Sequence, residues 1–466
     1  MKLYNTLTRK IEEIKPLNPP EVSVYSCGPT VYDYPHIGNW FTFIRYDILI
    51  RALKSAGFNP KWVMNITDVG HLTSDADEGE DKLEVGAKRE GKTAWDIAKK
   101  YTDYFVDAME KLNMQKPDYL EKATNNIESQ IELIKKLQEK GYTYATDDGV
   151  YYNTSKFADY SKLAKLDLER LKPGARVVVN PQKKNPTDFA LWKFSPKDRK
   201  RDMEWDSPWG KGFPGWHLEC SAIAMKYLGE TLDIHAGGID HIPTHHTNEI
   251  AQSEAVTGKK FVNHWMHANF LLVDNKKVAK SAGTFYTLED IEKKGFSLEA
   301  FRLLVLESHY RTEAHFSWQN LKSAQNRLIG LQNISDLRWQ PKVSNTSFDL
   351  TKDYEAMLES LEDDLNTPQA LSMISLWLVD KIEKIGFLPT NMLEDFQELL
   401  KKMDDLLGLQ LAGRSDITSE QKLILKEREK ARKTKDWAKA DELRKKLEEQ
   451  GIGIKDTDHG PIWSRL

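Results

Sequence analysis

The sequence predicts an α/β protein in which a parallel sheet is split by an insertion and is followed by a helical C-terminal third. Three observations support this. Strands alternate with a long apolar helix in residues 22–66, the alternation is interrupted over residues 101–204, and helical periodicity continues from residue 311 onward. A chain of 466 residues exceeds one compact core, and 40% apolar with 30% charged residues is typical of globular proteins.

The first half of the sheet is predicted from the N-terminal motifs. Residues 22–26 (VSVYS) form a β-rich run that ends at Cys27, and residues 39–56 carry apolar side chains at helical spacing. Residues 61–66 (KWVMNI) are predicted as the next strand. Because ligands bind at the carboxyl ends of parallel strands, we expect Cys27 at the ligand-binding edge.

The second half of the sheet follows the insertion. Residues 101–204 combine amphipathic helices with short strands and lead into a polar, charged stretch. Strand character resumes at residues 231–236 (TLDIHA), and the following Gly237 and Gly238 permit a tight backbone turn beside a ligand or a helix. A helix is expected from about residue 243 to the glycine at position 258.

Cys27 and Cys220 are the two cysteines of the chain. A free cysteine is most often a buried core residue, so this interpretation competes with a functional one. A disulfide is disfavoured because the N-terminal segment has no signal-peptide pattern. With no apolar run near the about 18 residues of a membrane span, we expect a soluble, cytoplasmic protein that does not contact a membrane.

A metal site is predicted around the two cysteines. His245 and Glu249 lie one helical turn apart and share a face, although such pairs are more often solvated. Two thiolates, one imidazole and one carboxylate form a plausible tetrahedral zinc set, with bonds of about 2.0–2.3 Å. We therefore predict one Zn²⁺ bound by Cys27, Cys220, His245 and Glu249, with His246 as a competing imidazole.

Two further segments suit a phosphate group. Residues 35–39 (PHIGN) run into the first long helix, whose N-terminus offers unpaired N–H groups and a positive dipole end. Residues 274–281 (DNKKVAKS) form a basic, turn-rich loop. Each segment alone is unspecific, because short lysine loops are mostly solvated.

In this order, the two segments resemble the signatures of class I aminoacyl-tRNA synthetases, an HIG-type motif and a K-x-x-K-S loop. The blocks around them resemble the cysteinyl-tRNA synthetase family over nearly the whole chain. These blocks are CGPTVYDYPHIGN, NITD, DSPWG with PGWHLEC, DIHAGGID, HHTNEIAQSEA, HWMHANFLLVDNKKVAKS, DDLNTPQAL and KDWAKADELRKKLEEQGI.

The resemblance implies a domain organisation and an activity. It implies a Rossmann-like catalytic domain in residues 1–100 and 205–310, a connective insertion in 101–204, a helical bundle contacting the tRNA stem in 311–415, and an anticodon-binding module in 416–466. It also implies a cysteine–tRNA ligase that forms cysteinyl-adenylate and charges the 3′ end of tRNA-Cys. The implied partners are ATP with Mg²⁺, L-cysteine and tRNA-Cys, and we expect a monomer.

The resemblance also implies roles for individual residues. The metal ligands would be Cys27, Cys220, His245 and Glu249. The catalytic residues would be His36, Asn39, Lys277 and Lys280. ATP would be bound by Gly38, Gly238, Asp240 and Lys280. The amino acid would be bound by Gly28, Thr67 and Trp216. The anticodon would be read by Arg432, Trp437, Asp441 and Asp456.

The chain departs from the family pattern in three places. One is at His241 and Ile242, which replace the residues expected after GGxD. The lysine loop reads KVAKS where the family usually has KMSKS, so both lysines remain and one hydroxyl is lost. After NITD, an additional acidic segment covers residues 75–81, and we expect it to be solvated.

Other interpretations use some of the same motifs. A ligase that joins activated cysteine to an amino sugar would lack the module in residues 420–466, and a zinc hydrolase leaves both phosphate motifs unexplained. Within residues 421–450, eleven basic residues face seven acidic ones, which suits RNA but also a solvated helix. Trp437 is predicted either to stack on an unpaired base or to pack against residues 451–454.

Overall fold

The computed structural model describes residues 1–71, 79–165, 180–274, 276–278, 283–344 and 346–466. The chain forms two compact units. Unit 1 comprises Met1–Asp290, Tyr310–Phe316 and Glu362–Leu365. Unit 2 comprises Ile291–His309, Ser317–Leu361 and Asn366–Leu466.

A five-stranded parallel sheet forms the centre of unit 1, with the strand order β11-β10-β3-β4-β5. Its strands are β3 (Glu21–Ser26), β4 (Asn59–Ile66), β5 (Tyr119–Lys122), β10 (Leu232–Gly238) and β11 (Val262–Ala268). The chain moves outward in one direction from β3 to β5 and in the other from β10 to β11. The order therefore reverses between β10 and β3, where open α/β sheets place their ligands.

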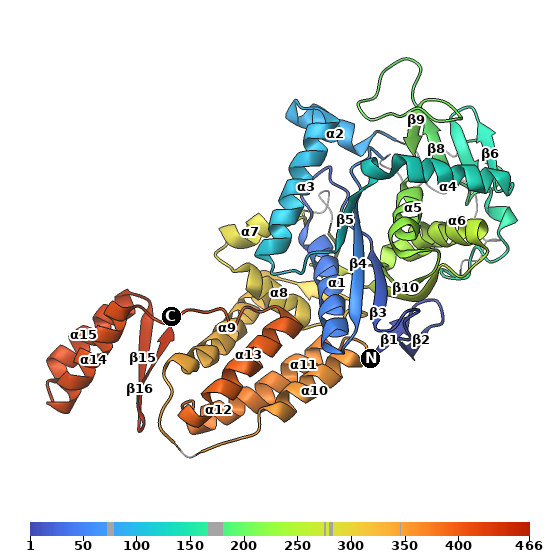
Figure 1. Cartoon of the computed structure of the whole chain (residues 1–466). Coiled ribbons are helices and arrows are strands. Elements are labelled where there is room, and N and C mark those ends of the chain that lie inside the picture. The colour runs from blue at the N-terminus through green and yellow to red at the C-terminus, as the bar shows by residue number, and fades with distance from the viewer. Residues whose placement is uncertain (72–78, 166–179, 275, 279–282, 345) are drawn as a thin grey trace. The chain divides into compact units, whose positions relative to one another are not determined.

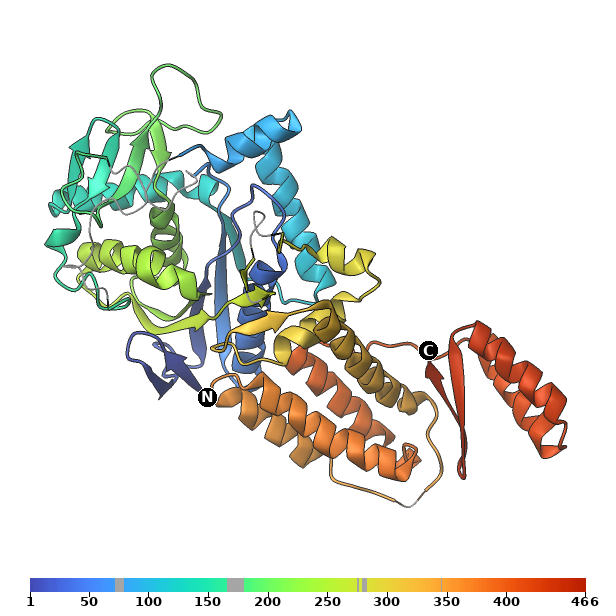
Figure 2. The ribbon, with the colours of Figure 1, turned by 180° about the vertical axis from the view of Figure 1, so that it is seen from behind.

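Helices cover both faces of this sheet, as the opposite views of Figures 1 and 2 show. One face carries α1 (Ile37–Ser55) and α3 (Ala94–Lys111). The other face carries α5 (Trp216–Leu228) and α6 (Thr247–Thr257). The central strands are therefore buried on both sides, which explains their nearly continuous apolar sequences.

Helix α1 begins at a capping box made by the HIGN motif. The Asn39 backbone N–H donates to His36 Nδ1 at 3.2 Å, and the His36 N–H donates to Asn39 Oδ1 at 3.0 Å. Further along, fully buried Trp40 stacks on Phe105 of α3 with ring centroids 5.2 Å apart. Burial of such a side chain contributes about 1.5–3 kcal/mol. The first turn of α1 is therefore stabilised both by the capping box and by the packing of Trp40.

The insertion forms a smaller antiparallel sheet within unit 1, with the order β6-β7-β8-β9. Its strands are β6 (Thr143–Thr146), β7 (Gly149–Tyr152), β8 (Phe189–Phe194) and β9 (Gly212–Pro214). Helix α4 (Ile127–Glu139) precedes it. Strand β9 leads directly into α5, so the insertion delivers the helix that carries Cys220.

Short elements complete unit 1. They are β1 (Lys2–Asn5), β2 (Lys10–Glu13), α2 (Lys82–Glu90), β12 (Leu271–Val273), β13 (Lys276–Lys277) and β14 (Ala314–Phe316). Helix α7 (Leu288–Lys293) spans the division between the units. The elements predicted for residues 22–66 occur with bounds shifted by no more than two residues.

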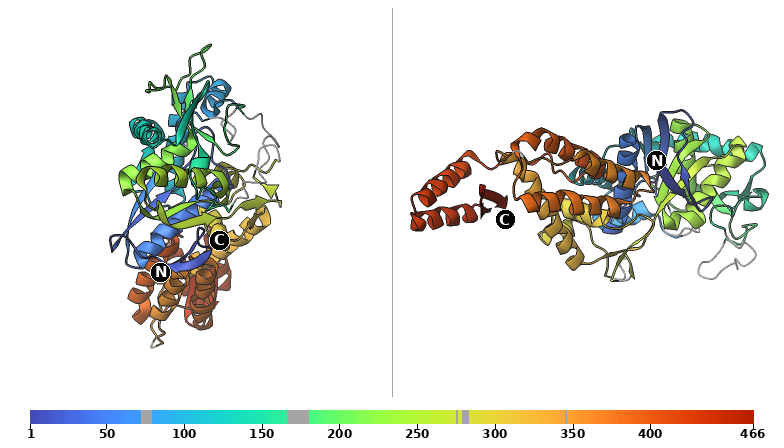
Figure 3. Two further views of the ribbon diagram at one scale, coloured as in Figure 1. Left: turned by 90° about the vertical axis from the view of Figure 1, so that its right-hand side faces the viewer. Right: turned by 90° about the horizontal axis from the view of Figure 1, so that it is seen from below.

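Unit 2 contains a helical bundle whose members run side by side in Figure 3. They are α8 (Leu298–Leu306), α9 (Trp318–Ser335), α10 (Thr351–Glu362), α11 (Thr367–Met373), α12 (Asp380–Ile385) and α13 (Leu393–Leu407). Helix α13 shows the predicted periodicity, because Phe396, Leu399, Met403 and Leu406 are buried at spacings of three and four residues.

Unit 2 ends in a small α/β module. It contains the helices α14 (Ser419–Lys433) and α15 (Trp437–Glu449) and the hairpin β15 (Ile452–Thr457) and β16 (Gly460–Arg465). Leu447, Ile454 and Trp463 contribute to its apolar core. Across the described parts of both units, none of the helices combines the length and apolar character that crossing a lipid bilayer requires.

Candidate active site

A cavity of about 450 Å³ lies at the carboxyl ends of the parallel strands in unit 1. Cys27 follows β3, Thr67 follows β4, and Gly238 ends β10, so three neighbouring strands bring these residues to one wall. The predicted site residues that line the cavity are Cys27, Gly28, His36, Gly38, Asn39, Thr67, Trp216, Cys220, Gly238, Asp240 and His245. The side chain of Lys277 and all of Lys280 lie outside the described residues.

The four predicted metal ligands converge. The donor atoms of Cys27, Cys220, His245 and Glu249 all lie within 4.8 Å of one another. His245 Nε2 is 3.3 Å from Cys220 Sγ and 3.1 Å from Glu249 Oε1. Ligands around a tetrahedral zinc ion are separated by about 3.3–3.8 Å, given metal–ligand bonds of about 2.0–2.3 Å. Apart from its ion-pair contacts with histidines, buried Glu249 Oε1 has no hydrogen-bond partner among the described residues, so the donor set fits a metal ion.

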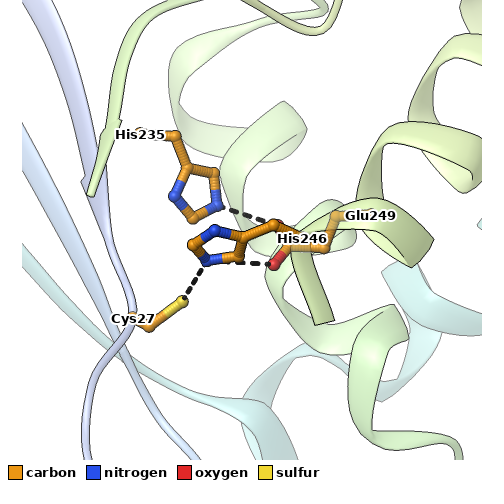
Figure 4. Close-up of side chains that lie close together, drawn as sticks. All are labelled: Cys27, His235, His246 and Glu249. Carbon is orange, nitrogen blue, oxygen red and sulfur yellow. Dashed lines mark hydrogen bonds and ion pairs between the residues drawn. The ribbon is translucent and has the colours of Figure 1, made fainter. Parts of the chain in front are cut away.

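A second donor set overlaps the first and is drawn in Figure 4. Cys27 Sγ lies 3.2 Å from His246 Nε2, and His235 Nε2 lies 2.8 Å from Glu249 Oε2. Cys220 and His245 line the cavity, whereas His235 and His246 are not among its lining residues. A metal ion bound by the set that contains His245 would therefore be accessible to a molecule in the cavity.

Local backbone structure brings both histidines to Glu249. The helix predicted from residue 243 begins with a π-type turn, Ile242–His246, before α6 starts. This wider turn places the imidazoles of His245 and His246 3.1 and 3.9 Å from the same carboxylate oxygen. Gly237 accommodates it, because a Cβ atom there would lie 2.2 Å from His246 Cε1. Of the two neighbours predicted for the glycine pair, a ligand or a helix, the structure therefore places the start of a helix beside Gly237.

Burial shifts the pKa of each group in the cluster toward its uncharged form. At Cys27, His245 and Glu249, neighbouring groups shift the pKa further in the opposite direction. Burial alone raises the pKa of Cys27, yet its hydrogen bond with Cys220 and nearby imidazoles lower this pKa well below the usual range. Burial and the Cys27 thiolate raise the pKa of Cys220 well above its usual range. Despite burial, Glu249 and Cys27 raise the pKa of His245 to about 10. Since metal ligands must be deprotonated, metal binding has to release protons here.

The tautomer of His245 is tied to its neighbour. His245 Nδ1 and His217 Nδ1 are 2.9 Å apart, so one of these atoms must donate to the other. If His245 Nε2 offers its lone pair to a metal, its proton resides on Nδ1 and His217 accepts it. Burial and the charge on His245 lower the pKa of His217 well below its usual range, which keeps His217 neutral and suits it as the acceptor.

Hydrogen-bond donors at the N-terminus of α1 also line the cavity. Burial lowers the pKa of His36 to about 4, so its ring is neutral at neutral pH. His36 Nδ1 accepts the Asn39 N–H, and the ring proton therefore resides on Nε2. Asn39 Oδ1 is likewise occupied by the His36 N–H, which leaves its amide group as a donor. Capping therefore leaves one side-chain donor on each of His36 and Asn39.

The polar residues of the cavity wall that the prediction missed include Asn65 and Glu219. Glu219 is completely buried, and its Oε1 accepts hydrogen bonds from Asn65 Nδ2 at 3.1 Å and from Thr67 Oγ1. A usable signal was present in the sequence, since Glu219 is an acidic residue in an otherwise largely apolar helix segment (HLECSAIA).

The acidic segment after NITD differs from its prediction at Asp81. Asp81 is 3% exposed rather than solvated. Its carboxylate caps α2 through the backbone N–H groups of Leu83 and Glu84, and it pairs with buried Arg201. Residues 75–78 of this segment lie outside the described residues.

Comparison with known proteins identifies the family. The model of the class I (C) catalytic domain of tRNA synthetases matches residues 13–326, and that of the cysteinyl-tRNA ligase anticodon binding domain matches residues 414–463. A cysteine–tRNA ligase from Treponema denticola is 42% identical over 498 aligned positions, covering 100% of both chains. Cysteine–tRNA ligase 1 from Burkholderia lata is 44% identical over 465 positions, covering 99% of this chain and 96% of the relative.

The chain belongs to the cysteine–tRNA ligase family. It is accordingly an enzyme of the aminoacyl-tRNA synthetase class, as the sequence motifs predicted. A solved structure of Mycobacterium tuberculosis methionyl-tRNA synthetase with methionyl-adenylate matches 84% of this chain and 92% of its own at a TM-score of 0.61. At 13% identity, this match confirms the class I fold and nothing further.

The predicted anticodon residues of the family module lie partly exposed. Trp437 is 56% exposed, and the Arg432 guanidinium lies 5.7 Å from its ring centroid. Asp456 forms two hydrogen bonds with buried Arg428, at 2.9 and 2.7 Å, and also pairs with Arg432 at 2.9 Å. Asp441 is exposed. Trp463 fills the module core, which leaves the Trp437 ring available at the surface.

Proposed function

We propose that the chain activates L-cysteine with ATP to cysteinyl-adenylate and transfers the cysteinyl group to the 3′ end of tRNA-Cys. One observation carries this proposal. A thiolate- and imidazole-containing donor set and a helix N-terminus with two side-chain donors line the same cavity. The first suits a thiol substrate, and the second suits a triphosphate.

The metal set is assigned to Cys27, Cys220, His245 and Glu249 within this proposal. A zinc ion held there would supply an acceptor for the substrate thiolate, which a serine hydroxyl, far harder to ionise, would not match. The residues themselves do the positioning: Cys27 directly follows strand β3, Cys220 lies on helix α5, and His217 orients His245. A purely apolar pocket would separate cysteine from serine by only about 1–3 kcal/mol, so the donor set matters for selectivity.

The ATP end of the cavity depends on positioning and on charge. His36 Nε2–H and the Asn39 amide are proposed to donate to phosphate oxygens, with the positive end of α1 behind them. Gly238 and Asp240 are assigned to the adenosine, and Mg²⁺ accompanies the nucleotide. Lys277 and Lys280 are assigned to the charge that develops on the phosphates during adenylate formation. Such preorganised donors stabilise the transition state because they need no rearrangement during the reaction.

The remaining parts of the chain are assigned to tRNA. We assign residues 311–415 to the tRNA stem and residues 416–466 to the anticodon. Support comes from the family match of residues 414–463 and from the exposed ring of Trp437 beside Arg432. An exposed aromatic ring with an adjacent guanidinium is a common platform for an unpaired base.

The proposal is tested by pyrophosphate exchange and tRNA charging with the metal-loaded protein. Cysteine is expected to support ATP–pyrophosphate exchange, serine to support it at least about 100-fold less well, and total tRNA to accept cysteine. Lys280→Ala is expected to slow the exchange without changing thermal stability. Equal exchange with cysteine and serine would contradict thiol selection, and failure to charge tRNA would favour the amino-sugar ligase alternative.

A further inference from the structure

Glu219 is a buried carboxylate at the cavity wall that the reaction assigned above does not use. It lies on α5, one turn after Trp216 and directly before Cys220, and it is completely buried. Among the described residues no lysine or arginine pairs with it, and its single ion-pair contact is His71 Nε2 at 3.5 Å. Burial of a carboxylate so weakly paired is costly, so a further cation is expected nearby when the site is in use.

The carboxylate organises the residues predicted to bind the amino acid. Glu219 accepts directly from Thr67 Oγ1 and from Asn65 Nδ2. Asn65 Oδ1 in turn accepts the Gly28 N–H at 2.8 Å. A Cβ atom on Gly28 would lie 1.7 Å from the Asn65 carbonyl oxygen, so this contact requires glycine. Thr67 and Gly28 therefore both depend on Glu219, one directly and the other through Asn65.

The hydrogen-bond inventory of Thr67 determines what its hydroxyl offers to the cavity. A hydroxyl has one proton and two lone pairs. The proton is donated to Glu219, and Asn65 Nδ2, at 3.0 Å, uses one lone pair. Among the described residues no further group uses the second lone pair, and Thr67 lines the cavity. The wall therefore offers an acceptor backed by a negative charge, which favours a cationic donor and disfavours a carboxylate.

We propose that Glu219 is the positioning residue of an ammonium subsite, which selects the α-ammonium group of the amino acid substrate. This inference rests on the function proposed above. Glu219 acts through Thr67, because it is itself fully buried. With the ammonium group at Thr67 and the thiol at the cysteine-containing donor set, the substrate carboxylate is left for the phosphate end of the cavity.

The test compares two thiols that differ in the ammonium group, L-cysteine and 3-mercaptopropionate. Their dissociation constants are measured by calorimetry with the metal-loaded wild type and with Glu219→Gln, which keeps the shape and an acceptor oxygen. We expect Glu219→Gln to weaken cysteine at least about tenfold and 3-mercaptopropionate less than about threefold. Equal weakening of both thiols, or no change, would overturn the proposal. Glu254→Gln, a partly buried glutamate of α6 outside the cavity lining, is the matched control and should leave the ratio unchanged.

Thr67→Val provides a second arm that does not depend on how well Glu219→Gln folds. It keeps the side-chain shape and removes the lone pair, so the same selective loss of cysteine binding is expected. A wild-type ratio in this variant would contradict the proposal. Wild-type exchange with cysteine is measured in parallel; its absence would refute the proposed function itself, whereas normal exchange with unaltered ratios in both variants refutes only the subsite.

Discussion

The metal-ligand cluster of unit 1 and the C-terminal module of unit 2 arrange their charges in opposite ways. In the cluster, the four predicted ligands are at most 5% exposed. In the module, the side chains of Arg432 and Asp456 are 37% and 32% exposed, and water screens their interaction. Buried groups therefore shift one another's protonation strongly, while the exposed groups remain available to a partner. Substitutions in the cluster should therefore change both stability and ligand binding. Substitutions of exposed residues in the module should change binding without changing stability.

The largest effect is expected from Cys220→Ser. Losing one of four buried ligands should weaken metal binding about 1,000-fold, or about 4 kcal/mol, and should raise the KM for cysteine. Metal content per chain and cysteine-dependent pyrophosphate exchange measure both effects. Ala222→Ser, two residues further along α5, controls for a new hydroxyl in this helix. A full metal content with an unchanged KM would show that Cys220 is only a core residue.

A second effect concerns the pH dependence of unit 1 through His36. Its pKa of about 4 in the folded chain lies below the ordinary value of 6.5, so the unfolded chain binds the proton more readily. Stability is therefore unaffected above about pH 6.5 and falls as the pH drops from there toward 4, by up to about 3 kcal/mol. His36→Gln should flatten this part of the curve of unfolding free energy against pH.

Loss of the cap by the same substitution would shift the whole curve by about 1 kcal/mol at every pH, which distinguishes it from the titration. Urea unfolding at a series of pH values measures both. An identical slope in the wild type and the variant would mean that His36 is not buried as a neutral ring.

A smaller effect is expected from Arg428→Met in the module. Arg428 is 2% exposed and makes two hydrogen bonds to Asp456, so its loss should destabilise the module by about 2 kcal/mol. Limited proteolysis of the module and tRNA charging should report this, while cysteine-dependent exchange stays normal. Arg444→Met is the matched control, because its exposed pair with Glu448 contributes at most about 0.5 kcal/mol. Equal effects of the two variants would mean that burial in the module does not matter.

The smallest effect is expected from Trp437→Ala. Because the ring is 56% exposed, stability should change by less than about 0.5 kcal/mol. Loss of one stacked base should nevertheless raise the KM for tRNA about tenfold, or about 1.4 kcal/mol, without altering pyrophosphate exchange. A drop in thermal stability together with a loss of exchange would instead indicate a structural role for Trp437.

Much of this organisation was predictable from local sequence. The strand before Cys27, the capping motif around His36 and the i, i+4 spacing of His245 and Glu249 depend on residues close together in the chain. Alternation of apolar residues and motif order were therefore enough to predict the α/β class and the family. The two cysteines, 193 positions apart, were predicted to share one metal site from their residue type and their positions, and the family resemblance implies the same site. In the structure their donor atoms lie within 4.8 Å of one another.

Other features were decided by tertiary structure alone. Of His245 and His246, only His245 lines the cavity, and this difference in position follows from the π-type turn packed against Gly237. Whether Trp437 packs against residues 451–454 or stays exposed likewise depends on long-range packing, and its ring is 56% exposed. The contacts of Glu219 with Asn65 and Thr67 could not be predicted from the sequence, because they depend on the packing of α5. Burial and convergence are properties of residues distant in sequence, so residue type and spacing predict the chemistry that is possible, and packing decides which groups perform it.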